Sequence, residues 1–175
     1  MYLNRELRFY ADIYYQGSTF RGEAMNFYLP GGNMSKDGIK GGSAPQSGYT
    51  IRKLNDPSQQ VGDVYGDTPW IWLRLAEMYL NYAEAQYMMG NEGEARAYVN
   101  IIRNRVGLPD ITSSGEQLFI DIQHERMIEL CFENHRFFDV RRWMIADATG
   151  NEDVMNLSWK RLNGLGELDP DGELS

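Results

Sequence analysis

Cysteine is almost absent from this sequence: Cys131 is the only one among 175 residues. A single cysteine cannot form an internal disulfide, and it leaves the redox compartment undecided. No run of eighteen apolar residues occurs, so no segment is predicted to span a membrane. The first residues show neither an apolar signal region nor a cysteine for lipid attachment, which taken alone favours a cytoplasmic protein.

Positive charge is also scarce, since the chain has 17 lysines and arginines and 25 acidic residues, which gives a net charge of −8. Nucleic-acid binding needs clustered basic residues that displace counterions, so this function is disfavoured. No P-loop, nucleotide-binding glycine fingerprint or nucleophile elbow occurs, and the sequence indicates no cofactor. A hydrophobic content of 42% and a length of 175 residues fit one soluble domain with a sizeable core.

Two helix patterns follow each other between residues 70 and 106. In both segments, 70–89 and 92–106, apolar residues recur at intervals of three and four. Gly90 and Asn91 tolerate the left-handed backbone that ends a helix, and Gly107 ends the second pattern in the same way. Because the connection is so short, we predict an antiparallel helix hairpin.

A second pair of helix patterns comes after the hairpin. The third helix is expected over 116–133 and the fourth over 136–148, with a break at Asn134. Residues 70–148 would then hold two hairpins of similar size in tandem, a helical-repeat arrangement in which each pair covers its neighbour. The polar tail, 149–175, is expected to be solvated or frayed.

A loop-rich segment, 1–69, precedes the helices. From Gly17 onward, glycines interrupt every candidate helix, and 9–15 is a candidate short strand. Aromatic residues are frequent among these glycines, whereas flexible linkers are poor in aromatics. We therefore expect long ordered loops of the kind that carries function, with a surface insertion that binds nothing as an equal alternative.

The densest polar cluster lies within residues 124–143. Helical spacing places Glu125 and Glu129 on an otherwise apolar face, where buried carboxylates must be paired or protonated. We expect a structural ion-pair network in which at least one of these glutamates binds an arginine from the same cluster. The expected members of the network are Glu125, Arg126, Glu129, Arg136, Asp139, Arg141 and Arg142.

Two other interpretations of this cluster are weaker. A glycosidase acid/base pair needs carboxylates that face each other across a substrate, whereas Glu125 and Glu129 point the same way. Asp121 and His124 have the spacing of one half of a di-iron site, but no second such pair exists. The sequence therefore predicts neither a catalytic residue nor a metal site.

Several segments resemble the SusD/RagB family in the family's own order. The matching segments are LRLAEMYLNYAEA at 73–85, NIIRNRVGLP at 100–109 and ERMIELCFENHRFFDVRRW at 125–143, with weaker upstream matches at 8–17 and 48–53. The resemblance covers the chain from Arg8 to Trp143. It departs from the family pattern at Val106, where alanine is usual, and at Asn134, where glycine is usual.

The resemblance implies a mostly α fold, with tetratricopeptide-like helix hairpins and a long irregular loop region. It also implies a non-enzymatic, lipid-anchored protein of the outer-membrane surface that binds glycans. Such proteins deliver oligosaccharides to a SusC-like TonB-dependent transporter. On this interpretation residues 1–175 are a C-terminal-half fragment of one such domain, and a signal peptide and lipid anchor are expected upstream.

The shared motifs mark helix packing and its ion pairs, so the sugar contacts must lie elsewhere. Sugar rings stack on aromatic side chains, and loop aromatics suit that chemistry. The expected ligand-binding residues are Tyr14, Tyr15, Phe20, Tyr49, Tyr65 and Trp70. The alternative function is a helical-repeat scaffold that binds a protein partner and no sugar. Rings gathered at one exposed site would favour glycan binding, and rings dispersed into the core would favour the scaffold.

Overall fold

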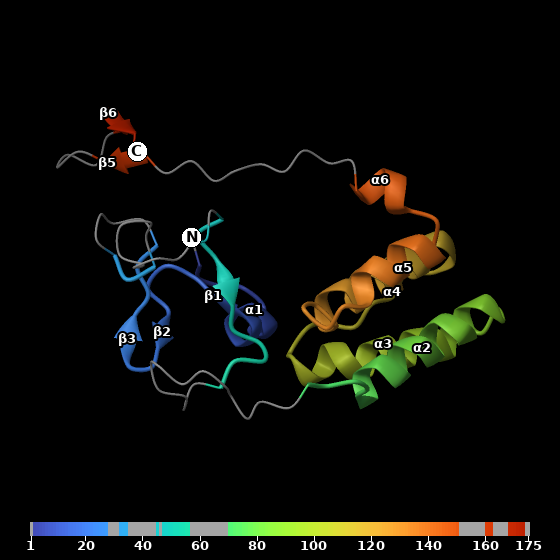
Figure 1. Ribbon diagram of the computed structural model, residues 1–175. Helices are drawn as coiled ribbons and strands as arrows, with labels where there is room; N and C mark the ends of the chain where they lie inside the picture. Colours follow the sequence, from blue (N-terminus) through green and yellow to red (C-terminus); the bar gives the residue numbers. More distant parts are fainter. Residues whose placement is uncertain are drawn as a thin grey trace. The chain divides into compact units, whose positions relative to one another are not determined.

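The computed structural model describes residues 2–27, 32–34, 45, 47–56, 70–150, 160–162 and 168–173. The chain forms two compact units, Met1–Ala11 with Pro69–Glu152 and Asp12–Thr68 with Asp153–Ser175. The described part is mostly helical, as Figure 1 shows, which confirms the predicted fold class. None of the helices in these ranges has the length and apolar content that crossing a bilayer requires.

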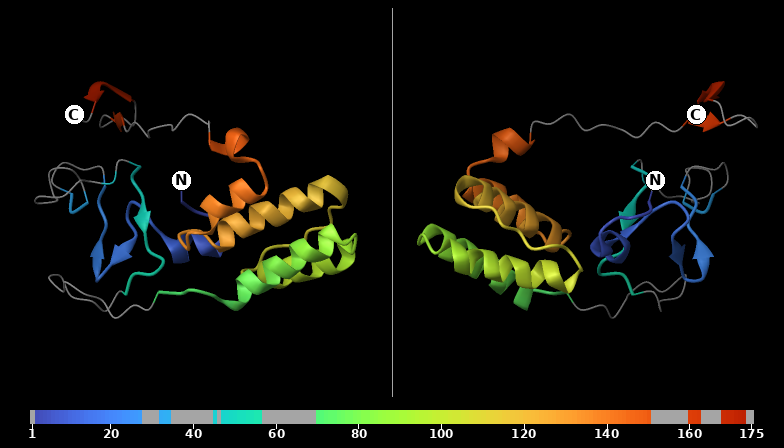
Figure 2. Two further views of the ribbon diagram at one scale, coloured as in Figure 1. Left: turned by 45° about the vertical axis from the view of Figure 1, so that its right-hand side comes forward. Right: turned by 180° about the vertical axis from the view of Figure 1, so that it is seen from behind.

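The first unit holds the helices. They are α1 (Leu7–Asp12, whose last residue belongs to the second unit), α2 (Leu75–Met88), α3 (Glu92–Arg105), α4 (Gly115–Glu129), α5 (His135–Arg142) and α6 (Ala146–Gly150). Helices α2 and α3 lie side by side as an antiparallel pair, and α4 packs against both (Figures 1 and 2). Helix α5 lies alongside α4 in each of these views.

The α2–α3 hairpin forms where the apolar stripes predict it. Gly90 adopts a φ of 81°, and the N–H of Asn91 donates to the carbonyl of Gln86 at 2.9 Å, closing the end of α2. Gly107 does the same for α3, with a φ of 72°. The hairpin therefore ends at glycines that tolerate left-handed backbone.

Small and branched side chains form the core between α2, α3 and α4. Its buried residues are Ala83, Ala95, Val99, Leu118 and Ile122 in one cluster, and Leu80, Ile102 and Leu130 in another. Alanines on the facing surfaces of α2 and α3 let the two helices approach closely. Because α4 packs against α2 and α3, charged side chains of the other helices lie against α4.

Helix α2 begins five residues later than predicted. Arg74 is its N-cap, with extended backbone at φ −144° and ψ 159°, and residues 70–73 precede the helix. Leu73 continues the apolar stripe in the sequence, yet its side chain is exposed. The prediction was wrong here because the side chain of Arg74 binds carboxylates on and just after α4, which fixes the backbone before the helix.

The third and fourth helices are also shorter than predicted. Helix α4 ends at Glu129, because Phe132 and Asn134 take left-handed φ values of 66° and 65°. Helix α5 ends at Arg142, because Met144 is left-handed as well, with a φ of 57°. The second helix pair is therefore unequal in length, and the short helix α6 follows it.

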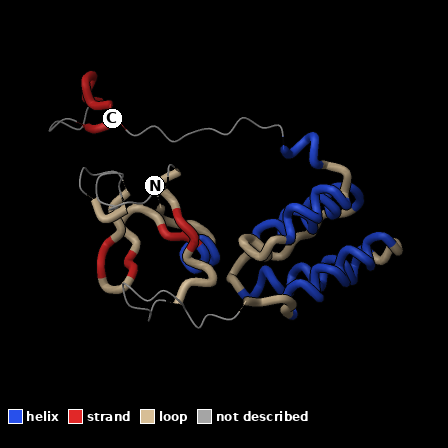
Figure 3. The backbone as a smooth tube through the Cα atoms, viewed as in Figure 1, coloured by secondary structure: helices blue, strands red, loops and turns tan. Residues whose placement is uncertain are grey.

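The second unit is built of loops and short strands, as Figure 3 shows by its colours. Its strands are β1 (Ile13–Tyr14), β2 (Thr19–Phe20), β3 (Glu23–Ala24), β4 (Thr50–Ile51), β5 (Lys160–Leu162) and β6 (Leu168–Glu173). The antiparallel pairs are β1 with β4, β2 with β3, and β5 with β6. The expected strand over 9–15 is mostly helix α1, and only Ile13 and Tyr14 are strand.

Candidate functional site

Glu129 lies on α4, and its side chain is at the centre of a cluster of arginines that come from other elements. Its carboxylate is 2% exposed and accepts hydrogen bonds from Arg74 Nη1 at 2.7 Å and from Arg8 Nη1 at 3.0 Å. Arg105 Nη2 lies 2.8 Å from both carboxylate oxygens. Three arginines from α1, from the N-cap of α2 and from the end of α3 therefore meet at one carboxylate.

Glu125 lies one turn earlier on the same face of α4 and is equally buried. It accepts hydrogen bonds from Arg8 Nη1 at 2.6 Å and from Arg103 Nη1 at 3.0 Å. The guanidinium of Arg8 thus bridges the two glutamates, and Glu6 pairs with it from the same short segment. The N-terminal helix is held to α4 by charge-assisted hydrogen bonds.

These contacts lower the pKa of Glu129. Burial by itself would raise that pKa, but the hydrogen bond from Arg74 and the positive charges of Arg74 and Arg105 outweigh it. The carboxylate therefore stays ionised at neutral pH. A glycosidase acid needs the opposite, a carboxyl group with a raised pKa that holds its proton, so Glu129 does not suit that role.

The pKa of Arg8 is raised. Burial would lower it, but the hydrogen bond to Glu6 and the negative charge of Glu125 act more strongly in the other direction. The pKa of Arg74 is raised against the same effect of burial, by hydrogen bonds to Glu133 and Glu129. Both arginines therefore keep their charge in spite of burial, and the cluster is held by ion pairs on every side.

A second charged cluster joins α5 to α4 and α2. Asp139 accepts hydrogen bonds from Arg126 Nε at 2.7 Å and from Arg142 Nη2 at 3.0 Å. Arg142 also pairs with Glu84 on α2, which accepts a further hydrogen bond from Trp143 Nε1 at 2.9 Å. The pKa of Arg142 is raised, because the hydrogen bond to Glu84 raises it by more than burial lowers it.

The expected partners of the two glutamates were wrong. Neither Glu125 nor Glu129 bonds to Arg126, Arg136, Arg141 or Arg142 among the described residues; their partners are Arg8, Arg74, Arg103 and Arg105. Arg126 is adjacent to Glu125 in the sequence, so on a helix it points to a different side, toward Asp139. Arg141 instead lies over the ring of Phe137 at 3.6 Å, and Arg136 lines the pocket described below.

The metal interpretation finds no support in the geometry. Asp121 accepts hydrogen bonds from Ser113 Oγ at 2.6 Å and from Gln117 Nε2 at 3.0 Å, so protein donors occupy its carboxylate. Within the described ranges, no three histidine, cysteine or acidic side chains gather where they could hold a metal ion.

The expected sugar-binding aromatics have different surroundings. Tyr14 is 4% exposed and forms a small core with Met25 and Phe27, so it lacks the free surface that sugar stacking needs. Phe20 packs edge-on against Tyr14, with ring centroids 5.2 Å apart.

Three of the remaining candidates lie in the described residues and keep some exposed surface. Tyr15 and Tyr49 are half-buried in the second unit. Trp70 is 48% exposed just before α2 in the first unit, and Tyr65 lies outside the described residues. Trp72, which the sequence analysis did not select, is 86% exposed beside it. The alternation of Trp70 and Trp72 ahead of the helix was the signal that could have identified Trp72 as well.

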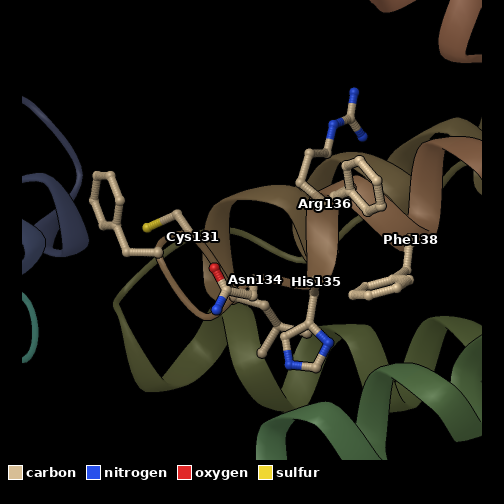
Figure 4. A pocket seen from close by; sticks show the side chains of 8 residues that line it. Cys131, Asn134, His135, Arg136 and Phe138 are labelled. Carbon is tan, nitrogen blue, oxygen red and sulfur yellow. The ribbon is translucent and has the colours of Figure 1, made fainter. Parts of the chain in front are cut away.

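An open pocket of about 620 Å³ lies at the turn from α4 into α5. Leu130, Cys131, Phe132, Asn134, His135, Arg136, Phe137 and Phe138 line it, and Figure 4 shows the labelled members. His135 Nε2 lies 3.7 Å from a carboxylate oxygen of Glu77 on α2. None of the described residues that line this pocket belongs to the arginine cluster around Glu129.

The comparison with protein families identifies the chain. The model of the SusD family matches residues 1–162. The chain belongs to the SusD family. A comparison with curated proteins gives no match.

Solved structures agree with this family. A SusD-like protein from Bacteroides fragilis is 41% identical, with a TM-score of 0.71 over 83% of this chain and 29% of that chain. The protein BT4246 is 30% identical, with a TM-score of 0.63 over 82% of this chain and 26% of that chain. A SusD superfamily protein from Bacteroides vulgatus, 22% identical with a TM-score of 0.54 over 87% of this chain and 35% of that chain, shares the fold. The chain thus spans 29% of the length of its Bacteroides fragilis relative.

The SusD-family motifs contain the arginines that the sequence analysis did not assign to the network. Arg74 lies in the first motif, Arg103 and Arg105 lie in the second, and Arg8 begins the upstream match. Arg103 and Arg105 also fit the dipole at the end of α3, which gave them a sufficient local explanation. The informative signal was that each motif contributes a charge opposite to the glutamates of 125–143.

Proposed function

We propose that this SusD-family protein binds oligosaccharides at the outer-membrane surface and passes them to a SusC-like TonB-dependent transporter. The observation that carries the proposal is the family match over residues 1–162, supported by 41% identity to a SusD-like protein. On this proposal a lipid anchor outside the residues of this chain holds the protein at the membrane. The protein acts by binding and needs no cofactor.

Aromatic residues that keep exposed surface, fully or in part, outside the helix core are the proposed sugar contacts within this chain. Trp70 and Trp72 precede α2, and more than a third of each side chain is exposed. Tyr15, Phe20 and Tyr49 are the corresponding candidates in the second unit. One stacked ring contributes about 1 kcal/mol beyond its buried area, so several rings must act on one ligand for useful affinity.

Calorimetric titration with a panel of neutral and acidic oligosaccharides tests the proposal. The parent protein should bind at least one glycan, and Trp72→Ala or Tyr49→Ala should weaken that binding several-fold. Leu3→Ala is the matched control, because Leu3 is 87% exposed and lies outside the aromatic set. If both aromatic variants bind as the parent does, the sugar site lies outside these residues.

A helical-repeat scaffold that binds a protein remains a second candidate, because α2 presents an exposed apolar row. The row consists of Leu75, Met78, Tyr82 and Met89, at helical spacing. Exposed apolar rows of this kind mark protein contacts in many soluble proteins. Failure of the parent to bind any glycan of the panel would favour this function over glycan binding.

A further inference from the structure

The pocket at the turn from α4 into α5 has the properties of a ligand site. Its volume of about 620 Å³ lies within the range of small-molecule sites. The described residues that line it all lie within 130–138 of the first unit, one continuous segment. Neither the arginine cluster nor the proposed aromatic contacts use this segment.

Aromatic rings form the apolar part of this pocket. Phe132, Phe137 and Phe138 line it and remain 39%, 57% and 66% exposed. The backbone of Phe132 has a φ of 66°, a conformation that costs free energy for a bulky side chain. Strain of this kind is concentrated at functional sites, where the surrounding structure compensates for it.

None of the described residues that line the pocket carries a carboxylate. Glu133 lies within this segment and Asp139 directly follows it, but both side chains are buried, and neither residue is among the described lining residues. Glu133 pairs with Arg74 at 2.7 Å, and Asp139 pairs with Arg126 at 2.7 Å.

Hydrogen-bond donors remain on the pocket lining. Arg136 carries a full positive charge there, and Asn134 adds an amide that both donates and accepts. Figure 4 shows the guanidinium of Arg136 extending outward from α5, while His135 points the other way. In a chain with a net charge of −8, a pocket whose described lining holds an arginine and no acidic residue favours an anionic ligand.

We propose that this pocket binds an acidic sugar unit, a pyranose with a carboxylate on its ring. The phenylalanine rings contact the apolar face of the sugar, Arg136 pairs with the carboxylate at the mouth, and Asn134 bonds to hydroxyls. This inference rests on the proposed glycan-binding function and specifies one ligand class and one location. Phosphate or an acidic peptide shares the charge but lacks the flat apolar face that the rings recognise.

The test uses trigalacturonate and its fully methyl-esterified form, which keeps the rings and removes the charges. Calorimetry on the purified protein should show that Arg136→Gln weakens trigalacturonate binding about tenfold, since it removes a charge-assisted hydrogen bond. The same variant should leave binding of the methyl ester unchanged. Phe138→Ala should weaken both ligands, because stacking does not depend on the carboxylate.

Arg5→Gln is the control, because Arg5 is exposed, lies outside the pocket and changes the net charge by the same amount. Equal weakening by Arg5→Gln and Arg136→Gln would show a long-range charge effect and would overturn the inference. Binding of neutral oligosaccharides without binding of trigalacturonate would overturn it too, and would leave the proposed function standing. Binding of no oligosaccharide would refute both.

Discussion

Replacing Glu129 by glutamine tests the arginine cluster at its centre. Glutamine has nearly the same shape as glutamate, so the packing of α4 against α2 and α3 stays in place. The substitution removes the negative charge to which Arg8, Arg74 and Arg105 all bond. It also places an amide N–H₂ group, which cannot accept a hydrogen bond, beside arginine donors.

The size of the effect depends on which carboxylates each arginine still contacts after the substitution. Arg8 is buried but keeps Glu125 and Glu6, and Arg74 keeps Glu133. Among the described residues Arg105 makes no other ion pair, but its side chain is 59% exposed and water can solvate it. Breaking a buried pair on one side costs 3–5 kcal/mol, so we expect the low end, about 3 kcal/mol, for Glu129→Gln.

Thermal and urea unfolding at pH 7 measure this cost. A loss of about 3 kcal/mol lowers the melting temperature of a chain of this size by about 6 to 12 °C. Glu116→Gln, an exposed position on the first turn of α4, is the control and should cost less than about 1 kcal/mol. If Glu129→Gln melts within a degree of the parent, the cluster is solvated and its buried geometry does not stabilise the fold.

Three further predictions concern charge and backbone. Because folding lowers the pKa of Glu129, this group contributes stability that is complete above its ordinary pKa of 4.5 and is lost as the pH falls through the lower pKa of the folded state. Below pH 4.5 the parent should therefore lose more stability than Glu129→Gln does, and urea midpoints measured across this pH range test the difference. Arg142→Ala removes the ion pairs with Glu84 and Asp139, but the arginine side chain is 47% exposed, so we expect a loss of about 1 kcal/mol in the free energy of unfolding. A loss as large as that of Glu129→Gln would contradict the role of burial. Asn134 has a left-handed backbone, so Asn134→Val should cost about 1–2 kcal/mol of stability, while Asn134→Gly should cost nothing or stabilise the fold. Equal urea midpoints for the two variants would refute the backbone argument.

The helix hairpin could be predicted from the sequence because its signals are local. The spacing of apolar residues, the glycines at 90 and 107, and the short connection each depend on a few neighbouring residues. Tertiary contacts then agreed with the local preference, since the predicted stripe of Leu80 and Ala83 is the buried one. The break expected at Asn134 belongs here too, because its φ of 65° is a left-handed conformation that asparagine tolerates.

The helix ends and the ion-pair partners could not be predicted, because distant residues determine them. Arg74 fixes the start of α2 through carboxylates 55 and 59 residues away in the sequence. Arg8 reaches Glu125 across 117 residues. The sequence shows that buried carboxylates need partners but not which arginines supply them, so the nearest ones were chosen wrongly.

The burial of Tyr14 shows the same limit for binding residues. An aromatic residue among glycines can stack on a ligand or on its own unit, and composition does not separate the two cases. Tyr14 packs with Met25 and Phe27, whereas Trp72 has the exposure that stacking on a ligand needs. Exposure is therefore the property that a ring in this chain must have before it counts as a candidate contact.

The arrangement of charges separates the parts of the chain that stabilise it from the parts that are free to bind. Four motif arginines from three separate segments meet at Glu125 and Glu129, whose carboxylates are occupied by these protein partners. A ligand could reach these carboxylates only by displacing arginines, at a cost of several kcal/mol. Trp72 and Arg136 lie outside both clusters of ion pairs, so their substitution should change ligand binding with little change in stability. Glu129→Gln should do the reverse, and measuring both quantities on the same three variants distinguishes a binding surface from a structural network.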